Sequence, residues 1–186
     1  LAMKTGRPVK LSLTVEESTR FHPKRHAMKI AFSLAAKKDG TFHAVKALIL
    51  GDTGGYASVG DKVLERAAGH ACGPYKVPNV GIEAHTIYTN NPIAGAFRGF
   101  GVNQIAFALE GCIDRLARHL GMDPWEIRHK NALRPGDVFG TGQVIDEGAG
   151  IVATLEAIKP RYDEAVAAGK HVGVACGCKN VGMGNG

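Results

Sequence analysis

Apolar and polar residues alternate along several short segments of the chain, and such alternation is typical of half-buried β-strands. The segments are Pro8–Val15, Met28–Ala36, Thr41–Leu50 and Gly81–Tyr88, and a strand-like apolar run follows at His171–Cys178. The sequence Lys-Lys-Asp-Gly separates the second segment from the third and favours a tight turn. We therefore expect these two segments to form an antiparallel hairpin.

Four other segments are predicted to be helices, either from apolar residues at a spacing of about 3.6 residues or from residues typical of a helix start and end. They are Asp61–Cys72, Val102–Leu120, Pro124–Asn131 and Ile151–Ala168. The third helix has an aspartate directly before it and a proline in its first turn, both typical of a helix start. Pro160 lies inside the fourth helix and is expected to kink or split it. Together these elements predict an α+β domain with a mostly antiparallel sheet and helices packed on one side.

The composition is that of a soluble globular domain. Of the 186 residues, 45% are hydrophobic and 22% are charged. No apolar run approaches the ~20 residues needed to cross a bilayer, and residues 1–10 lack the apolar core of a signal peptide. These features predict a cytoplasmic protein without a membrane partner. The chain does not begin with methionine and stops just after a strand-like run, so we expect it to be a fragment of a longer polypeptide.

The formal net charge of +6 raises the question of a nucleic-acid partner. Lysine and arginine are spread along the chain, and the aromatic residues make up only 6% and do not alternate with them. A stacking platform for single strands would need that alternation. We therefore expect no nucleic-acid partner. A non-catalytic basic binding module remains open as an alternative to an enzyme.

The cysteines do not form a recognisable metal-binding pattern. Cys176 and Cys178 are the only two that lie close together, and their spacing matches neither zinc nor iron–sulfur patterns. We interpret them, with Cys72 and Cys112, as small thiols in a reducing compartment.

The most distinctive segment is Asn91–Gln104, in which three glycines, Gly95, Gly99 and Gly101, flank Arg98. It leads directly into the longest predicted helix. Backbone N–H groups at a helix N-terminus can bind an anion, and an arginine adds planar donors suited to phosphate or carboxylate. The alternative is a loop that needs positive φ angles and an arginine that forms a surface salt bridge.

Residues 95–104, Gly-Ala-Phe-Arg-Gly-Phe-Gly-Val-Asn-Gln, resemble the signature of the molybdenum hydroxylases, the xanthine dehydrogenase and aldehyde oxidase family. Four more segments occur in the order and spacing of that family. They are Thr5–Pro8, Glu65–Ala67, Tyr75–Asn79 and Arg128–Leu133. The resemblance implies that residues 1–186 are part of the molybdopterin-binding domain. The pterin loop would then lie upstream of this fragment, and the catalytic glutamate would lie downstream.

The resemblance also implies a chemistry and a set of partners. The family hydroxylates an electron-poor carbon at a molybdenum–molybdopterin cofactor, carried as the pterin or as a dinucleotide, with water as the oxygen source. Electrons leave through [2Fe–2S] clusters to FAD on partner domains or subunits. We expect a small-molecule substrate, and we expect the protein to form a homo-oligomer.

The family's functional positions map onto this chain as follows. The implied cofactor-binding residues are Ala96, Phe97, Arg98, Gly99 and Gln104, with Arg98 beside the metal, and the implied substrate-binding residues are Arg66 and Phe100. No catalytic residue is expected in the fragment, which should be inactive alone. Three glutamates, Glu65, Glu110 and Glu126, are interpreted as structural or helix-surface groups.

The substrate is left open by two departures from the family pattern. Asn103 stands where a proline is common, and Gly69 replaces a bulkier residue of xanthine-specific members. Retention of the Glu65–Arg66 pair favours a purine-like N-heterocycle and a xanthine dehydrogenase-like enzyme. Aldehydes and aromatic acyl thioesters are the alternative substrates.

Overall fold

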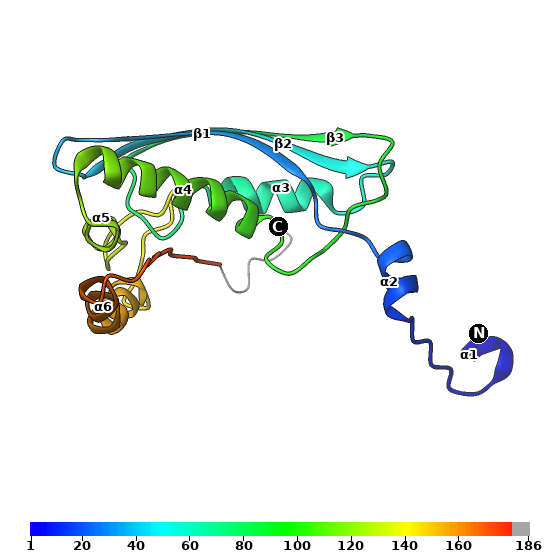
Figure 1. Cartoon of the computed structure of the whole chain (residues 1–186). Coiled ribbons are helices and arrows are strands. Elements are labelled where there is room, and N and C mark those ends of the chain that lie inside the picture. Colours follow the sequence, from blue (N-terminus) through cyan, green and yellow to red (C-terminus); the bar gives the residue numbers. More distant parts are fainter. Residues whose placement is uncertain (180–186) are drawn as a thin grey trace.

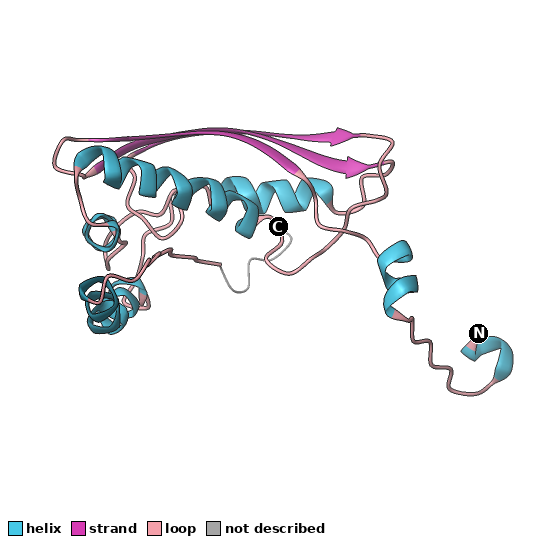
Figure 2. Ribbon diagram, in the orientation of Figure 1, coloured by secondary structure: helices cyan, strands magenta, loops and turns pink. Residues whose placement is uncertain are grey.

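The computed structural model describes residues 1–179 (Figures 1 and 2). Its elements, in chain order, are α1 (Ala2–Thr5), α2 (Val15–Phe21), β1 (Met28–Ala36), β2 (Phe42–Gly54), α3 (Gly60–Gly69), β3 (Asn79–Tyr88), α4 (Val102–Leu120), α5 (Pro124–Asn131) and α6 (Ile151–Ala167).

The three strands form one sheet in the order β1-β2-β3. β1 and β2 are the expected antiparallel hairpin, with Met28 opposite Gly51 at one end and Ala36 opposite Phe42 at the other. β3 pairs parallel to β2, because α3 carries the chain back along the sheet between them. The α+β class is confirmed, and the sheet is mixed, with one antiparallel and one parallel pairing.

Helices α3 and α4 lie on one face of this sheet, as expected (Figure 1). β1 alternates between half-buried and exposed positions along its whole length, so only one of its faces contributes to the core. One buried cluster joins Ile49 of the sheet to Leu64 and Ile105 of the two helices. A second cluster, around Phe42 and Ile113, extends the core toward α5 and α6.

Two predicted strands are absent from the described part of the chain. Pro8–Val15 has no strand partner there, and its last residue begins α2 instead. Thr14 and Glu17 form a capping box, in which each side chain bonds the other's backbone N–H, and this local signal starts a helix. His171–Cys178 is likewise outside any strand or helix. Pro160 does not split α6, which runs unbroken.

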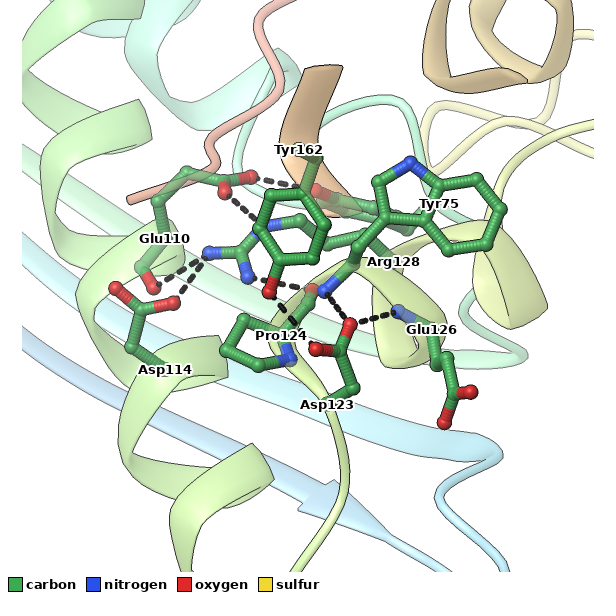
Figure 3. Close-up of polar contacts among 9 residues, drawn as sticks. Tyr75, Glu110, Asp114, Asp123, Pro124, Glu126, Arg128 and Tyr162 are labelled. Atoms are coloured by element: carbon green, nitrogen blue, oxygen red, sulfur yellow. Dashed lines mark hydrogen bonds and ion pairs between the residues drawn. The ribbon is translucent and has the colours of Figure 1, made fainter. Parts of the chain in front are cut away.

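A buried ion-pair network joins α4 to α5 (Figure 3). The guanidinium of Arg128 is fully buried and donates from Nε to Glu110 Oε2 at 2.7 Å and from Nη2 to Asp114 Oδ1 at 2.7 Å. Its Nη1 donates to the carbonyl of Pro124 at 2.9 Å. The hydroxyl of Tyr75 donates to Glu110 Oε1 at 2.7 Å. Glu110 is therefore a structural group, and Asp114 pairs with α5 across the helix interface.

The same region ties α6 to the start of α5 (Figure 3). Asp123 caps α5 by accepting hydrogen bonds from the backbone of Trp125 at 2.7 Å and of Glu126 at 3.1 Å. It also accepts one from the hydroxyl of Tyr162 at 2.8 Å. Burial and this carboxylate raise the pKa of Tyr162 to about 12. The indole N–H of Trp125 donates to the carbonyl of Leu155 at 2.9 Å, so α5 is held from both sides.

The partners in this network shift the pKa values of its members so that Arg128 stays charged and Tyr75 stays protonated. Burial alone would lower the pKa of Arg128, but Glu110, Tyr75 and Asp114 together outweigh burial and raise that pKa. Burial and the same carboxylate raise the pKa of Tyr75, so the phenol stays a donor. Removing one member of such a pair leaves an uncompensated buried charge.

We predict that Glu110→Gln lowers the free energy of unfolding by about 3–5 kcal/mol. Asp114→Asn is a matched control because it removes a carboxylate from the same arginine at a side chain that is 49% exposed. That change should cost no more than about 1 kcal/mol. Urea unfolding followed by the fluorescence of Trp125, the single tryptophan, measures both. Equal losses in the two variants would contradict the assignment.

Candidate functional site

The turn that leads into the glycine-rich segment is anchored to the end of β2. The carboxylate of Asp52 accepts hydrogen bonds from the Thr89 hydroxyl at 2.6 Å, from the Asn91 side chain at 2.5 Å and from the Gly54 backbone at 2.7 Å. These bonds, with that of Thr89 foremost, lower the pKa of Asp52. The carboxylate therefore stays charged and holds the approach to the segment in place.

The segment 95–101, here called the signature loop, makes a tight turn before α4. Gly99, Phe100 and Gly101 all have positive φ angles, of 89°, 50° and 96°. Two backbone hydrogen bonds close the turn, from the Phe100 amide to the Phe97 carbonyl at 2.8 Å and from the Val102 amide to the Gly99 carbonyl at 3.0 Å. A positive φ at a residue other than glycine costs on the order of 1–2 kcal/mol. Phe100 is thus held in a strained conformation by its surroundings.

Gly101 brings the signature loop against α3. A Cβ atom at Gly101 would lie 2.2 Å from the carbonyl oxygen of Val63 and 3.2 Å from the amide nitrogen of Ala67. Only a residue without a side chain allows this approach. The start of α4 therefore lies within one helical turn of Arg66, so two segments that are distant in sequence meet here.

The first half of the signature loop offers donors without partners. Within residues 1–179, the backbone amides of Ala96, Phe97, Arg98 and Gly99 make no hydrogen bond, and the exposed Arg98 side chain has no ion pair. A run of free N–H groups beside a guanidinium can bind a group that carries several oxygen acceptors, such as a phosphate. The surface salt bridge considered for Arg98 does not form within this range.

Arg66 is buried, whereas a helix arginine is usually solvated. Its Nη1 lies 2.7 Å from Oε1 of Glu65, so these adjacent residues do form an ion pair. The carbonyl of Arg66 also lies 2.8 Å from Nδ1 of His70. This ion pair joins a buried guanidinium to a carboxylate whose side chain is 47% exposed, so it lies at the border of the core. A buried cation of this kind interacts strongly with any negative charge brought close to it.

Gln104, in the first turn of α4, and Phe100, in the loop, are both half-buried. Gln104 donates from Nε2 to the carbonyl of His26 at 3.1 Å, which fixes the first turn of α4 to the start of β1. Its Oε1 is buried and has no hydrogen-bond partner in the part of the chain that the structure describes, and the same holds for Nε2 of His26. A buried acceptor without a donor is suited to a ligand or to another segment of polypeptide.

The cysteines fit their structural interpretation. All four are free thiols, and burial raises the pKa of Cys72 and of Cys178 to about 11. Among the described residues, no group of three or more histidine, cysteine or acidic side chains could hold a metal ion. No helix in that range is long and apolar enough to cross a membrane.

Arg25 is a residue that the sequence analysis did not single out. It contacts the signature loop at Phe97 and the start of α4 at Asn103. Asn103 is 78 residues away in the chain. No local sequence pattern signals a contact of that range.

Comparison with known proteins identifies the family of the chain. Residues 1–132 match the family model described as the molybdopterin cofactor-binding domain. This match defines the class of the chain as a cofactor-binding domain. The chain belongs to the molybdopterin cofactor-binding domain family, and the resemblance to the molybdenum hydroxylases is confirmed.

Individual relatives are much longer than this chain. It is 46% identical over 166 residues to the nicotinate dehydrogenase large molybdopterin subunit of Eubacterium barkeri, covering 89% of this chain and 39% of that protein. It is 46% identical over 158 residues to a probable xanthine dehydrogenase subunit of Bacillus subtilis, covering 85% of this chain and 21% of that protein. The solved structure of the aldehyde oxidoreductase from Desulfovibrio gigas superposes with a TM-score of 0.82 at 39% identity, covering 90% of this chain and 18% of that one.

We predict that Gly101→Ala lowers stability by about 2–4 kcal/mol, from backbone strain and from the displacement of Val63. Gly111→Ala is the matched control, because Gly111 lies within α4 and its added Cβ would meet nothing within 4 Å. That change should raise stability by about 0.5–1 kcal/mol. Thermal melting followed by circular dichroism measures both. An unchanged melting temperature in Gly101→Ala would show that the close approach to α3 is not required.

Proposed function

We propose that this chain is part of the catalytic, molybdopterin-binding subunit of a xanthine dehydrogenase-like oxidoreductase. When bound, the molybdenum–pterin cofactor supplies the redox centre for hydroxylating an electron-poor carbon. The observation that carries the proposal is the exposed array of backbone donors from Ala96 to Gly99, which have no partner among residues 1–179 and lie beside Arg98. Membership of the cofactor-binding family supports it.

In this proposal the loop residues and Gln104 bind the cofactor through different groups. The amides of Ala96, Phe97, Arg98 and Gly99 donate to oxygen atoms of the cofactor, and the Arg98 guanidinium adds a positive charge beside the metal. Gln104 offers its buried Oε1, which accepts no hydrogen bond from the described residues, as an acceptor. The strained turn keeps these donors in place before the ligand arrives, which lowers the entropy cost of binding.

Arg66 and Phe100 are proposed to contact the substrate. Arg66 carries a buried positive charge, which would stabilise negative charge that develops on a substrate oxygen during reaction. Phe100 offers an aromatic surface at the turn of the loop. We propose an N-heterocyclic substrate of the purine class. In support, the names of two relatives that are 46% identical refer to nicotinate and to xanthine, which are both N-heterocycles.

The alternative substrate is an aldehyde or an aromatic acyl thioester. It is favoured by the structural match to an aldehyde oxidoreductase at 39% identity. Asn103 and Gly69, which depart from the xanthine-specific pattern, leave room for this alternative. A non-catalytic binding module would follow only if the intact protein carried no cofactor.

The rest of the catalytic apparatus is proposed to come from outside residues 1–186. Glu65 is paired with Arg66, and Glu110 is committed to Arg128 and Tyr75, so neither is available to act as a general base. A further part of the polypeptide would supply the catalytic glutamate and the pterin loop, and partner domains or subunits would carry [2Fe–2S] clusters and FAD. A homo-oligomer and a cytoplasmic location remain predictions.

We predict that Arg98→Ala in the intact enzyme weakens cofactor retention about ten- to a hundredfold, as expected for losing a hydrogen bond to a charged group. Arg115→Ala, which removes another exposed arginine, on α4, is the control and should retain the cofactor. Molybdenum and pterin per chain are measured after anaerobic purification. Molybdenum-free wild-type protein from cells with a working cofactor pathway would favour the binding module instead.

For the substrate, we predict that Arg66→Met lowers kcat for an N-heterocycle such as xanthine or nicotinate by about a hundredfold, the size of effect seen when a transition-state donor is lost. Turnover of an aromatic aldehyde should change much less. Arg66→Lys keeps the charge and should recover part of the loss. Steady-state kinetics with matched molybdenum content measures the difference. Equal losses with both substrates would assign Arg66 a purely structural role.

A further inference from the structure

The segment that carries Arg25 runs directly beside the entrance to the signature loop. Lys24 forms an isolated parallel bridge with Ala94, and the Gly95 amide donates to the carbonyl of Lys24 at 2.9 Å. A Cβ at Gly95 would lie 2.4 Å from Cβ of Pro23, so the glycine permits this close approach. The backbone of Arg25 is therefore held at a fixed position relative to the loop.

From that position Arg25 contacts both ends of the turn. Its guanidinium carbon lies 4.6 Å from the centre of the Phe97 ring, within the range of a cation–π interaction. Its Nη1 donates to Oδ1 of Asn103 at 2.9 Å. Phe97 is 50% exposed, so packing in the core does not hold its ring. The arginine spans the turn from its first aromatic residue to the first turn of α4.

The loop needs such support. Phe100 is held at a positive φ angle, and a residue in that region persists only when its surroundings determine it. The amides from Ala96 to Gly99 have no partners among the residues that the structure describes, so they do not stabilise the turn themselves. The contacts of Arg25 therefore add to the two backbone hydrogen bonds that close the turn and to the close approach of Gly101 to α3.

We propose that Arg25 is a positioning residue for cofactor binding, acting through Phe97 and Asn103 to preorganise the signature loop. The inference rests on the proposed function of the loop. Asn103 occupies a position where the family commonly has proline, whose side chain offers no hydrogen-bond acceptor. The bond from Arg25 to Asn103 therefore adds a loop restraint that a chain with proline at this position lacks.

The test compares four variants of the cofactor-loaded enzyme: Arg25→Ala, Asn103→Ala, the double variant and the control Arg20→Ala. Arg20 is an exposed arginine of α2 that pairs with Glu16 of the same helix. Release of molybdenum and pterin is followed after dilution into cofactor-free buffer. Arg25→Ala should release them about tenfold faster, since it loses a cation–π contact and a hydrogen bond. The double variant should be no faster than Arg25→Ala, because Arg25→Ala already removes the hydrogen bond to Asn103.

A second measurement separates positioning from general stability. Hydrogen exchange at the amides of Phe100 and Val102, which close the turn, should quicken about tenfold in Arg25→Ala, while the melting temperature stays within a few degrees. Arg25→Lys keeps the charge but not the planar fork, and should fall between wild type and alanine. Unchanged exchange and unchanged release in Arg25→Ala would overturn the proposal. The same is true if the Arg20→Ala control shows the same losses.

The two proposals fail in different ways. If the wild-type enzyme carries no molybdenum or pterin, the proposed function is wrong, and Arg25 then has no cofactor to position. Hydrogen exchange would still report whether it holds the turn. If the wild-type enzyme carries the cofactor and Arg25→Ala neither releases it faster nor loosens the turn, the proposed function stands and the role of Arg25 is rejected.

Discussion

The buried ion pair between Arg128 and Glu110 fixes the position of α4, the helix that carries the signature loop at its start. It joins α4 to α5, and the capping carboxylate of Asp123 extends the same connection to Tyr162 of α6. Since α4 packs along the sheet, its direction sets where the loop that precedes it turns (Figure 1). A charged pair this deep tolerates little rearrangement, because either partner alone would be an uncompensated charge in the core. The loop is therefore presented by a rigid support.

At the N-terminal end of α4, the helix is positioned by close backbone contact and, among the described residues, not by an ion pair. Gly101 lets the helix start touch α3 at Val63, which places the loop within a turn of Arg66. Gly95 lets the chain at Pro23 approach, so that Arg25 reaches over the loop. The glycines of the motif thus bring other parts of the molecule to the loop, and the described residues leave the amides between them available to a ligand.

Local signals predicted much of this structure. The helix Pro124–Asn131 has the predicted bounds, because an aspartate cap and a proline in the first turn fix its start by chemistry within a few residues. The hairpin of β1 and β2 was also predicted from local signals, namely alternating apolar residues on both sides of a tight-turn sequence. The predicted strand Pro8–Val15 was wrong. Alternation leads to a strand only where a partner strand pairs with it, and the described residues provide none. The capping box at Thr14 favours a helix there instead.

The long-range contacts could not be predicted in this way. The parallel pairing of β3, the burial of Glu110 against Arg128 and the contacts of Arg25 depend on which elements meet in space. The signature loop itself was identified, because its glycines and Arg98 are adjacent in sequence. Arg25 was not identified, because no local pattern signals its contact with Asn103, which is 78 residues away in the chain.

The central claim is that the amides of Ala96 to Gly99 bind the cofactor. An experimental structure of the intact, cofactor-loaded enzyme tests it most directly. The account predicts oxygen atoms of the cofactor within about 3.2 Å of at least two of these amides, with Arg98 beside them. A molybdenum–pterin cofactor bound elsewhere, with the loop amides bonded to water or to another segment of the polypeptide, would contradict it.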